Sequence, residues 1–157
     1  VNIHQKPSGI ELANITIGIA QNAKKLGYNP KVAILSYSNF GNPPGSNTKV
    51  INECLKILED KKVSFEFDGE MTAEVALDYN LIKENYPFCK LSGPANVLIM
   101  PDLYSANISF KLLQKMENLS VIGPIMIGGN NPFQILQMGA SVSDIVNSAC
   151  ISTYNSL

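Results

Sequence analysis

Apolar residues recur with the 3.6-residue period of an amphipathic helix in several stretches of the chain. In the first stretch, Ile10, Ile17 and Ala20 fall on one helical face. Ser8 precedes this stretch as an N-cap residue, and Gly27 follows it as a stop signal. The predicted helices cover residues 9–27, 48–60, 72–86, 104–116 and 142–154. The range 72–86 is expected to contain short helical pieces that end before Pro87.

Four shorter apolar runs alternate with these helices. Residues 31–38 and 95–100 are nearly continuous apolar runs, typical of buried strands, and residues 120–129 are predicted to form a last strand with a glycine-rich exit. Residues 63–71 alternate apolar and polar positions, which predicts a strand with one face in solvent. This order favours an α/β fold with three layers, in which a mostly parallel sheet is flanked by helices.

The loop after the first predicted strand, "SYSNFGNPPGS", is a candidate ligand site. Ligands of open parallel sheets bind beyond the carboxyl ends of the strands. Ser36, Ser38, Asn39 and Gly41 could present hydroxyl and backbone N–H groups to an anion there. The loop lacks the G-x-x-x-x-G-K-[ST] pattern of a P-loop, so a purely structural turn is the alternative interpretation.

Two further strand exits carry candidate residues. In "MPDLYSAN", Asp102 or Ser105 can cap the following helix, and substrate contact by Asp102 or Asn107 is the alternative. Gly128 and Gly129, at the exit of the last predicted strand, are candidates for binding a ligand through their backbone.

The stretch "NNPFQILQMGASVSDIVNSA" precedes and begins the last predicted helix. Ser141 and Asp144 have the spacing of a capping box, which explains both residues without catalysis. Gln137 cannot act as an acid, a base or a strong nucleophile, and Met138 is most simply a packing residue. No catalytic set of residues is therefore expected in this stretch.

Three carboxylates recur at every second position of the predicted strand 63–71. Glu66, Asp68 and Glu70 are thereby expected on one side of the sheet. A paired-carboxylate hydrolase or an oxygen-ligand metal site would use such a set. The plainer interpretation, which we prefer, is a solvated strand face.

Composition narrows the choice of partners. The chain of 157 residues has a formal net charge of −1, and all of its 12 cationic residues are lysine. Without a basic tract or a long apolar run, neither a nucleic-acid nor a membrane partner is expected. The three cysteines are expected to be reduced thiols of a cytoplasmic protein, and with His4 as the single histidine no metal site is expected.

Four blocks of the sequence carry a resemblance to a known family, and they occur in this order: "KVAILSYSNFG", "FDGEMTAEVAL", "LSGPANVLIMPDLYSANISFKLLQ" and "GPIMIGGNNPFQIL…ASVSDIV". Together they resemble the phosphate acetyl/butyryltransferase family, in particular the version fused behind the catalytic half of bacterial NADP-dependent malic enzymes. The resemblance runs from Gly9 to Asn155 and covers the second half of the transferase module. It implies that residues 1–123 form the second of two lobes and that residues 124–157 are a tail that returns to the first lobe.

The resemblance also implies a degenerate active site. Active members carry a D-L-S-R-G-type run whose serine and arginine handle CoA and phosphate. Here Gln137 and Met138 stand in place of that serine and arginine, whereas Asp144 corresponds to the aspartate proposed as catalytic base. Loss of the hydroxyl and the guanidinium removes positioning and charge stabilisation, so we expect no acetyl transfer.

Malic-enzyme fusion implies a regulatory and oligomerisation domain that senses acetyl-CoA or a related acyl-CoA as effector and takes part in a homo-oligomer. NADP and a divalent metal, Mg²⁺ or Mn²⁺, are implied for the catalytic half, and no cofactor for this chain. The first residue is Val, so the chain is expected to be a piece of a longer polypeptide. The tail after Pro124 is expected to pack on its own chain in a new way, to swap between chains or to support a dimer. An active phosphate acetyltransferase and a purely structural oligomerisation domain remain the alternatives.

Overall fold

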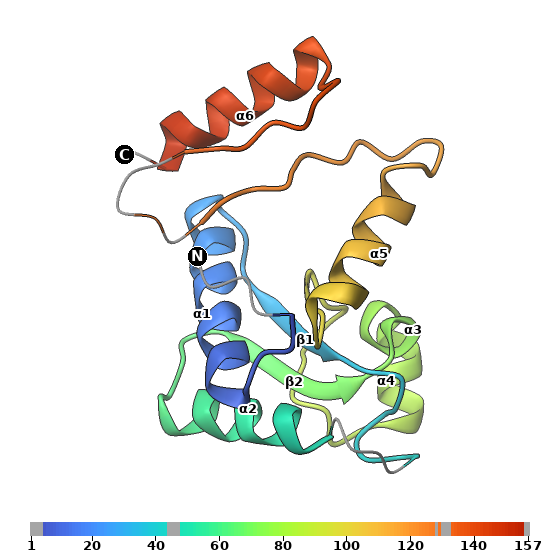
Figure 1. Ribbon diagram of the computed structural model, residues 1–157. Helices are drawn as coiled ribbons and strands as arrows, with labels where there is room; N and C mark the ends of the chain where they lie inside the picture. Colours follow the sequence, from blue (N-terminus) through green and yellow to red (C-terminus); the bar gives the residue numbers. More distant parts are fainter. Residues whose placement is uncertain (1–4, 44–47, 128, 130–132, 156–157) are drawn as a thin grey trace. The chain divides into compact units, whose positions relative to one another are not determined.

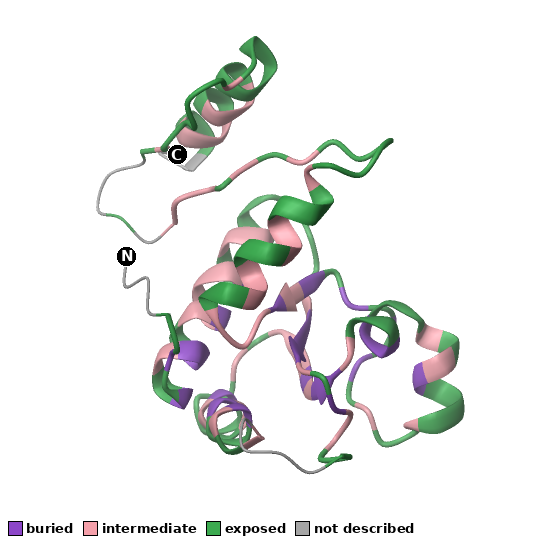
Figure 2. Ribbon diagram, turned by 45° about the vertical axis from the view of Figure 1, so that its right-hand side comes forward, coloured by how far each residue is buried: buried purple, intermediate pink, exposed green. Residues whose placement is uncertain are grey.

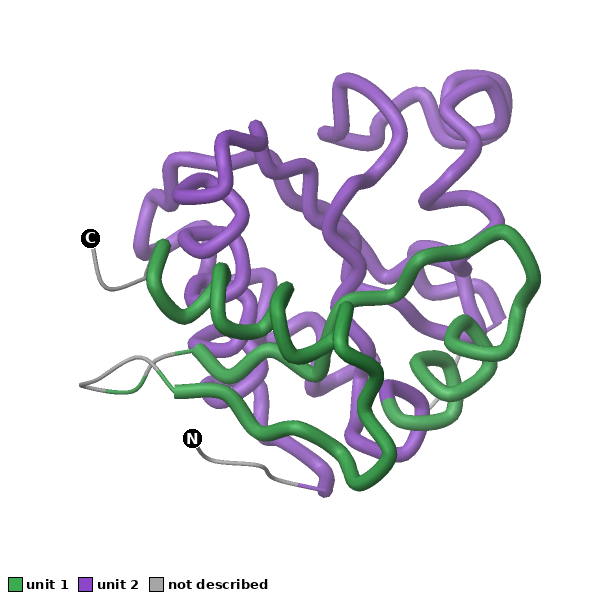
Figure 3. Tube along the Cα trace, turned by 90° about the horizontal axis from the view of Figure 1, so that it is seen from above, with its two compact units in different colours: residues 1–3, 107–157 green, residues 4–106 purple. Residues whose placement is uncertain are grey.

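The structure is a computed structural model that describes residues 5–43, 48–127, 129 and 133–155 (Figure 1). The chain forms two compact units, residues 4–106 and residues 107–157 together with 1–3 (Figure 3). The larger unit contains the sheet and the helices that cover it. The smaller unit contains most of one helix, an extended stretch and the last helix.

The larger unit is built on three parallel strands in the order β2-β1-β3. They are β1 (Lys31–Leu35), β2 (Glu66–Met71) and β3 (Val97–Ile99), each shorter than its predicted run. The central strand has buried residues at four successive positions, as expected for a strand covered on both faces. This arrangement confirms the predicted three-layer α/β class.

The helices lie close to their predicted bounds. The described helices are α1 (Gly9–Lys25), α2 (Thr48–Asp60), α3 (Ala73–Leu77), α4 (Tyr79–Asn85), α5 (Leu103–Leu113) and α6 (Val142–Asn155). Ser8 caps α1 as predicted, and Glu11, which was not predicted, completes a capping box with it. None of the helices in the described ranges is long and apolar enough to cross a membrane.

Each face of the sheet has its own hydrophobic cluster, because successive side chains of a strand point to opposite sides. Val32 and Ile34 of β1 pack with residues of α1 and α2, such as Leu12 and Ile51. Ala33 and Leu35 of the same strand belong to the second cluster. That cluster also contains Val75 and Ala76 of α3 and Ile82 of α4, and the buried positions are visible in Figure 2.

The prediction of a strand at 120–129 is wrong for the described residues of that range. Residues 121–127 form no ladder, and Pro124 has no N–H group to donate to one. The amide of Gln134 instead accepts from the backbone N–H of Met126 at 2.8 Å and donates to its carbonyl at 3.3 Å. The side chain of Gln134 thus makes the two hydrogen bonds to the Met126 backbone that a neighbouring strand would otherwise make.

The prediction of a solvated carboxylate face on β2 is also wrong. Glu66 is partly exposed, but Asp68 and Glu70 are only 8% and 2% exposed. The alternation does not hold along the whole strand, because Phe67 packs with one hydrophobic cluster and Met71 with the other. Loops bring donors to Glu66 and Asp68. The backbone N–H of Ser92 donates to Glu66 at 2.8 Å, and that of Lys90 donates to Asp68 at 2.7 Å.

Candidate functional site

The loop after β1 is tied to the carboxyl end of β2 by hydrogen bonds, three of which involve backbone N–H groups. The backbone N–H of Ser36 donates to the carbonyl of Met71 at 2.9 Å, and that of Phe40 donates to the carbonyl of Glu70 at 2.7 Å. The side-chain oxygen of Asn39 accepts from the backbone N–H of Thr72 at 2.8 Å. The loop is therefore held in one place at the edge of the sheet where ligands of this fold class bind.

A β-bulge sets the position of Glu70 at this edge. Ile34 pairs with Gly69 and the next residue, Leu35, pairs with Met71, so Glu70 has no partner across the ladder. Bulges redirect side chains and are common beside functional sites. The side chain of Glu70 is 2% exposed, and its Oε1 accepts a hydrogen bond from the hydroxyl of Ser38.

The second oxygen of the same carboxylate is unpaired. Oε2 of Glu70 is buried and has no hydrogen-bond partner in the structure described here. The hydroxyls of Ser36 and Ser38 lie 3.3 Å apart, and the Ser38 hydroxyl is engaged with the other carboxylate oxygen. A buried acceptor without a donor is uncommon in proteins and calls for an explanation.

A cavity of about 220 Å³ lies beside this carboxylate, between the end of β2, the loop after β1 and the start of α2. Its lining residues are Phe40, Gly41, Thr48, Asn52, Gly69 and Glu70. Gly41 has a φ of +88°, a conformation that favours glycine. The described lining contains one carboxylate and no cationic side chain, so its charge is opposite to that of an anion site.

The structure brings the four predicted residues of the first loop together but gives them different roles. Gly41 lines the cavity, whereas the side chains of Ser38 and Asn39 bond Glu70 and the backbone of Thr72. Ligand binding by these residues remains a prediction. Sequence reasoning missed Thr48 and Asn52, although the first residues of a helix that follows a parallel strand face this edge.

In the second candidate loop, "MPDLYSAN", Asp102 caps the helix that follows, α5. Oδ1 of Asp102 accepts from the backbone N–H of Ser105 at 2.8 Å and from its hydroxyl at 2.8 Å. The backbone N–H of Ser105 and its hydroxyl hold the pKa of Asp102 below its usual value. Asp102 does not line the cavity beside Glu70. Gly129 is exposed, and Gly128 lies outside the described residues.

Residues 135–138, which include Gln137 and Met138, lie in the smaller unit and line a second hollow of about 520 Å³ with residues from segments 114–123 and 139–148. The ammonium of Lys111 donates to the side-chain oxygen of Gln137 at 3.0 Å, and Met138 is fully exposed. Asp144 completes the predicted capping box, with the backbone N–H and hydroxyl of Ser141 each 2.8 Å from its Oδ2. These two bonds, the hydroxyl first, lower the pKa of Asp144.

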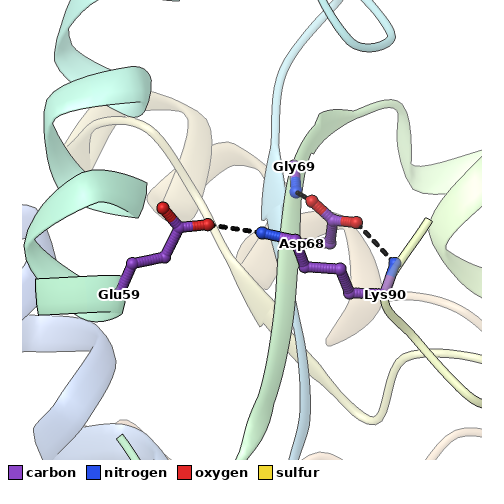
Figure 4. Close-up of polar contacts among 4 residues, drawn as sticks. All are labelled: Glu59, Asp68, Gly69 and Lys90. Carbon is purple, nitrogen blue, oxygen red and sulfur yellow. Dashed lines mark hydrogen bonds and ion pairs between the residues drawn. The ribbon is translucent and has the colours of Figure 1, made fainter. Parts of the chain in front are cut away.

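The other polar contacts and the thiols of the described residues suggest no further site. Asp68 accepts from the backbone N–H groups of Gly69 and Lys90, and the Lys90 ammonium pairs with Glu59 (Figure 4). The three cysteines are unpaired thiols. No cluster of three or more potential metal ligands occurs among the residues that the structure describes.

The parallel sheet, its two helical layers and the cavity at its carboxyl edge define a three-layer α/β fold. The sequence profile of the family described as Phosphate acetyl/butaryl transferase matches residues 1–153. The chain belongs to this family.

Three relatives illustrate the similarity. The chain is 49% identical over 153 residues to the NADP-dependent malic enzyme of Rhizobium meliloti (strain 1021), covering 98% of this chain and 20% of that enzyme. It is 39% identical over 146 residues to the phosphate acetyltransferase of Helicobacter pylori (strain J99), covering 93% of this chain and 28% of that protein. The crystal structure of a phosphotransacetylase from Streptococcus pyogenes superimposes with a TM-score of 0.90 at 31% identity, over 98% of this chain and 47% of that one. The chain therefore spans from a fifth to about half of the length of these relatives.

Proposed function

We propose that this chain is a regulatory and oligomerisation domain of an NADP-dependent malic enzyme, that it responds to acetyl-CoA or a related acyl-CoA, and that it has no transferase activity. The observation that carries the proposal is the 49% identity to a malic enzyme of which this chain corresponds to only 20%. The parent enzyme would convert malate to pyruvate by oxidative decarboxylation. NADP and Mg²⁺ or Mn²⁺ would act in its catalytic half.

The side chains of the degenerate motif support the absence of transfer chemistry. Met138 is fully exposed and offers neither a charge nor a hydrogen bond to a phosphate. Gln137 shares its side-chain oxygen with Lys111, and an amide is no nucleophile. Asp144 is held by Ser141 as a helix cap, with its pKa lowered, which makes it a weaker base.

The test uses the full-length protein. Malate-dependent reduction of NADP is measured with and without acetyl-CoA, and binding of acetyl-CoA is followed by isothermal titration. We expect binding and a change in malate kinetics, because an effector must bind two states of the enzyme with different affinity. Unchanged kinetics together with a silent titration would refute the regulatory part and leave a purely structural oligomerisation domain.

An active phosphate acetyltransferase is the second candidate, favoured by the 39% identity to such an enzyme and by the retained Asp144. It predicts formation of acetyl-CoA from acetyl phosphate and CoA by the full-length protein, and loss of this activity in Asp144→Asn. Asp144→Asn also weakens the cap of α6, so Ser141→Ala is the matched control for the cap alone. We expect no transfer in any of the three proteins.

A further inference from the structure

We propose that the cavity beside Glu70 binds an N–H donor group, an amide or an ammonium, whose hydrogen is accepted by Oε2 of Glu70. The inference rests on the proposed function where it takes this donor to be an amide of the pantetheine arm of an acyl-CoA. Glu70 lines the cavity, is 2% exposed and has one oxygen bonded by Ser38 and one without a partner. A ligand N–H would complete the set of bonds of this carboxylate.

The charge of the lining selects the class of ligand. Glu70 is the one charged residue among the described lining residues, and no lysine offsets it. A phosphate or a carboxylate placed there would meet a like charge, which is unfavourable at short range. The site therefore excludes the phosphate end of an acyl-CoA and favours a neutral amide or a cation.

The other lining groups suit an amide that lies within an aliphatic chain. Asn52 offers a polar side chain in the first turns of α2, where a carbonyl oxygen is favoured by the helix dipole. The cavity volume of about 220 Å³ is below the ~300–1,000 Å³ of sites that enclose a whole drug-sized ligand. It fits a segment of a larger molecule.

The aromatic wall of the cavity is held in place. Phe40 has a φ of +49°, which is uncommon for a non-glycine residue. Its ring contacts those of Tyr86 and Phe88 at centroid distances of 5.1 Å and 4.9 Å. Such strain persists where the surroundings fix it, and it presents a preformed apolar surface to the methylene groups on either side of an amide.

The test compares Glu70→Gln with Glu66→Gln in the full-length protein. Glu66 is on the same strand but does not line the cavity, so its variant controls for loss of one carboxylate. Titrations use acetyl-CoA, pantetheine and methylammonium chloride. Glu70→Gln keeps the shape of the side chain and can still accept from Ser38 through its carbonyl oxygen, but it turns an amide N–H donor toward the ligand. We expect Glu70→Gln to weaken binding about 10- to 100-fold, because the loss of a hydrogen bond to a charged group raises the Kd by about this factor. We expect Glu66→Gln to bind the probes as wild type does.

Thermal unfolding without ligand separates binding from a structural role. We expect the Tm of Glu70→Gln to equal or exceed that of wild type, because the variant removes a buried charge that lacks a cation. A lower Tm with unchanged affinity would assign Glu70 a structural role and overturn the proposal. If Glu70→Gln does not fold, Asn52→Leu, at an exposed position of α2, narrows the same cavity and is expected to weaken the same titrations.

The three probes distinguish the sources of the donor. Glu70-dependent binding of pantetheine supports the acyl-CoA arm, and Glu70-dependent binding of methylammonium alone supports an ammonium ligand. If acetyl-CoA binds and none of the three probes distinguishes wild type from Glu70→Gln, the inference is overturned but the proposed function stays intact. Glu70-dependent binding with no effect on malate kinetics supports the inference and counts against the proposed function. If none of the probes binds to wild type, the inference is overturned, and water is then the partner of Oε2.

Discussion

Asp68 offers a direct test of how the loop before β3 is held to β2 (Figure 4). The side chain is 8% exposed; Oδ1 accepts from the backbone N–H of Gly69 at 2.9 Å, and Oδ2 accepts from that of Lys90 at 2.7 Å. Asp68→Ala removes both acceptors. Hydrogen bonds to charged groups contribute about 1.5–3 kcal/mol each, and water can partly replace them here, so we expect a loss of about 2–4 kcal/mol in the free energy of unfolding.

Asp68→Asn sharpens this estimate because it keeps one acceptor oxygen. It should lose one of the two bonds and cost about 1–2 kcal/mol. The free energies come from urea denaturation, with the midpoint expected to fall and the slope m to stay constant. Hydrogen exchange of the Lys90 backbone N–H gives a local measure, and we expect it to become faster in both variants.

Lys90→Met is the matched control, because it keeps the backbone N–H that Asp68 accepts and removes only the side-chain ion pair. The side chains of Lys90 and Glu59 are 58% and 52% exposed, so this pair is expected to contribute less than about 1 kcal/mol. A cost below about 0.5 kcal/mol for Asp68→Ala would refute the reasoning. An equal cost for Lys90→Met and Asp68→Ala would also refute it, since the ion pair would then be the main contact.

Three other predictions follow from single contacts. Gly69→Ala places a Cβ 2.8 Å from the backbone oxygen of Ile34, so we expect a loss of about 1–3 kcal/mol on urea denaturation, and an unchanged midpoint would contradict this. Burial raises the pKa of Cys54 to about 11, whereas Cys150 is exposed; iodoacetamide near neutral pH should modify Cys150 first, as peptide mass spectrometry would show. The folded-state pKa of Asp144 lies below the ordinary 3.8, so its contribution to capping is present above that value and lost as pH falls through the folded pKa. Circular dichroism should show this loss of helix in wild type, with a smaller change in Asp144→Asn.

Features set by neighbours in sequence were predicted well. The N-cap at Ser8, the cap at Asp102 and the capping box of Ser141 and Asp144 were predicted from the local sequence, because each uses groups within one turn of its helix. The part of Glu11 in the cap of α1 was not predicted. The sheet and its two helical layers were predicted from apolar periodicity, since β1 is too uniformly apolar for a strand with a wet face.

Features set by distant segments were not predicted. The period of two placed the three carboxylates of β2 on one face, but a register shift at Glu70 breaks the alternation. Their hydrogen-bond donors, on Ser38, Lys90 and Ser92, lie about twenty or thirty positions away. A strand at 120–129 needs a neighbouring ladder, and sequence periodicity carries no information about whether that neighbour exists.

Asp144 and Glu70 show why the identity of a residue at a family position is a weaker guide to chemistry than its bonds. Asp144 stands where the family resemblance places a catalytic base, yet both groups that it accepts from belong to the first turn of its own helix. Glu70 was interpreted as one of three solvated carboxylates, yet it has a buried oxygen that no donor among the described residues bonds, and this oxygen lies beside a cavity. Replacing an acid whose oxygens are bonded within the fold chiefly affects stability, whereas replacing an acid with an unpaired buried oxygen affects what the fold can bind. On this reasoning the capacity to recognise a ligand lies with Glu70 at the edge of the sheet, and Asp144 serves the helix that it caps.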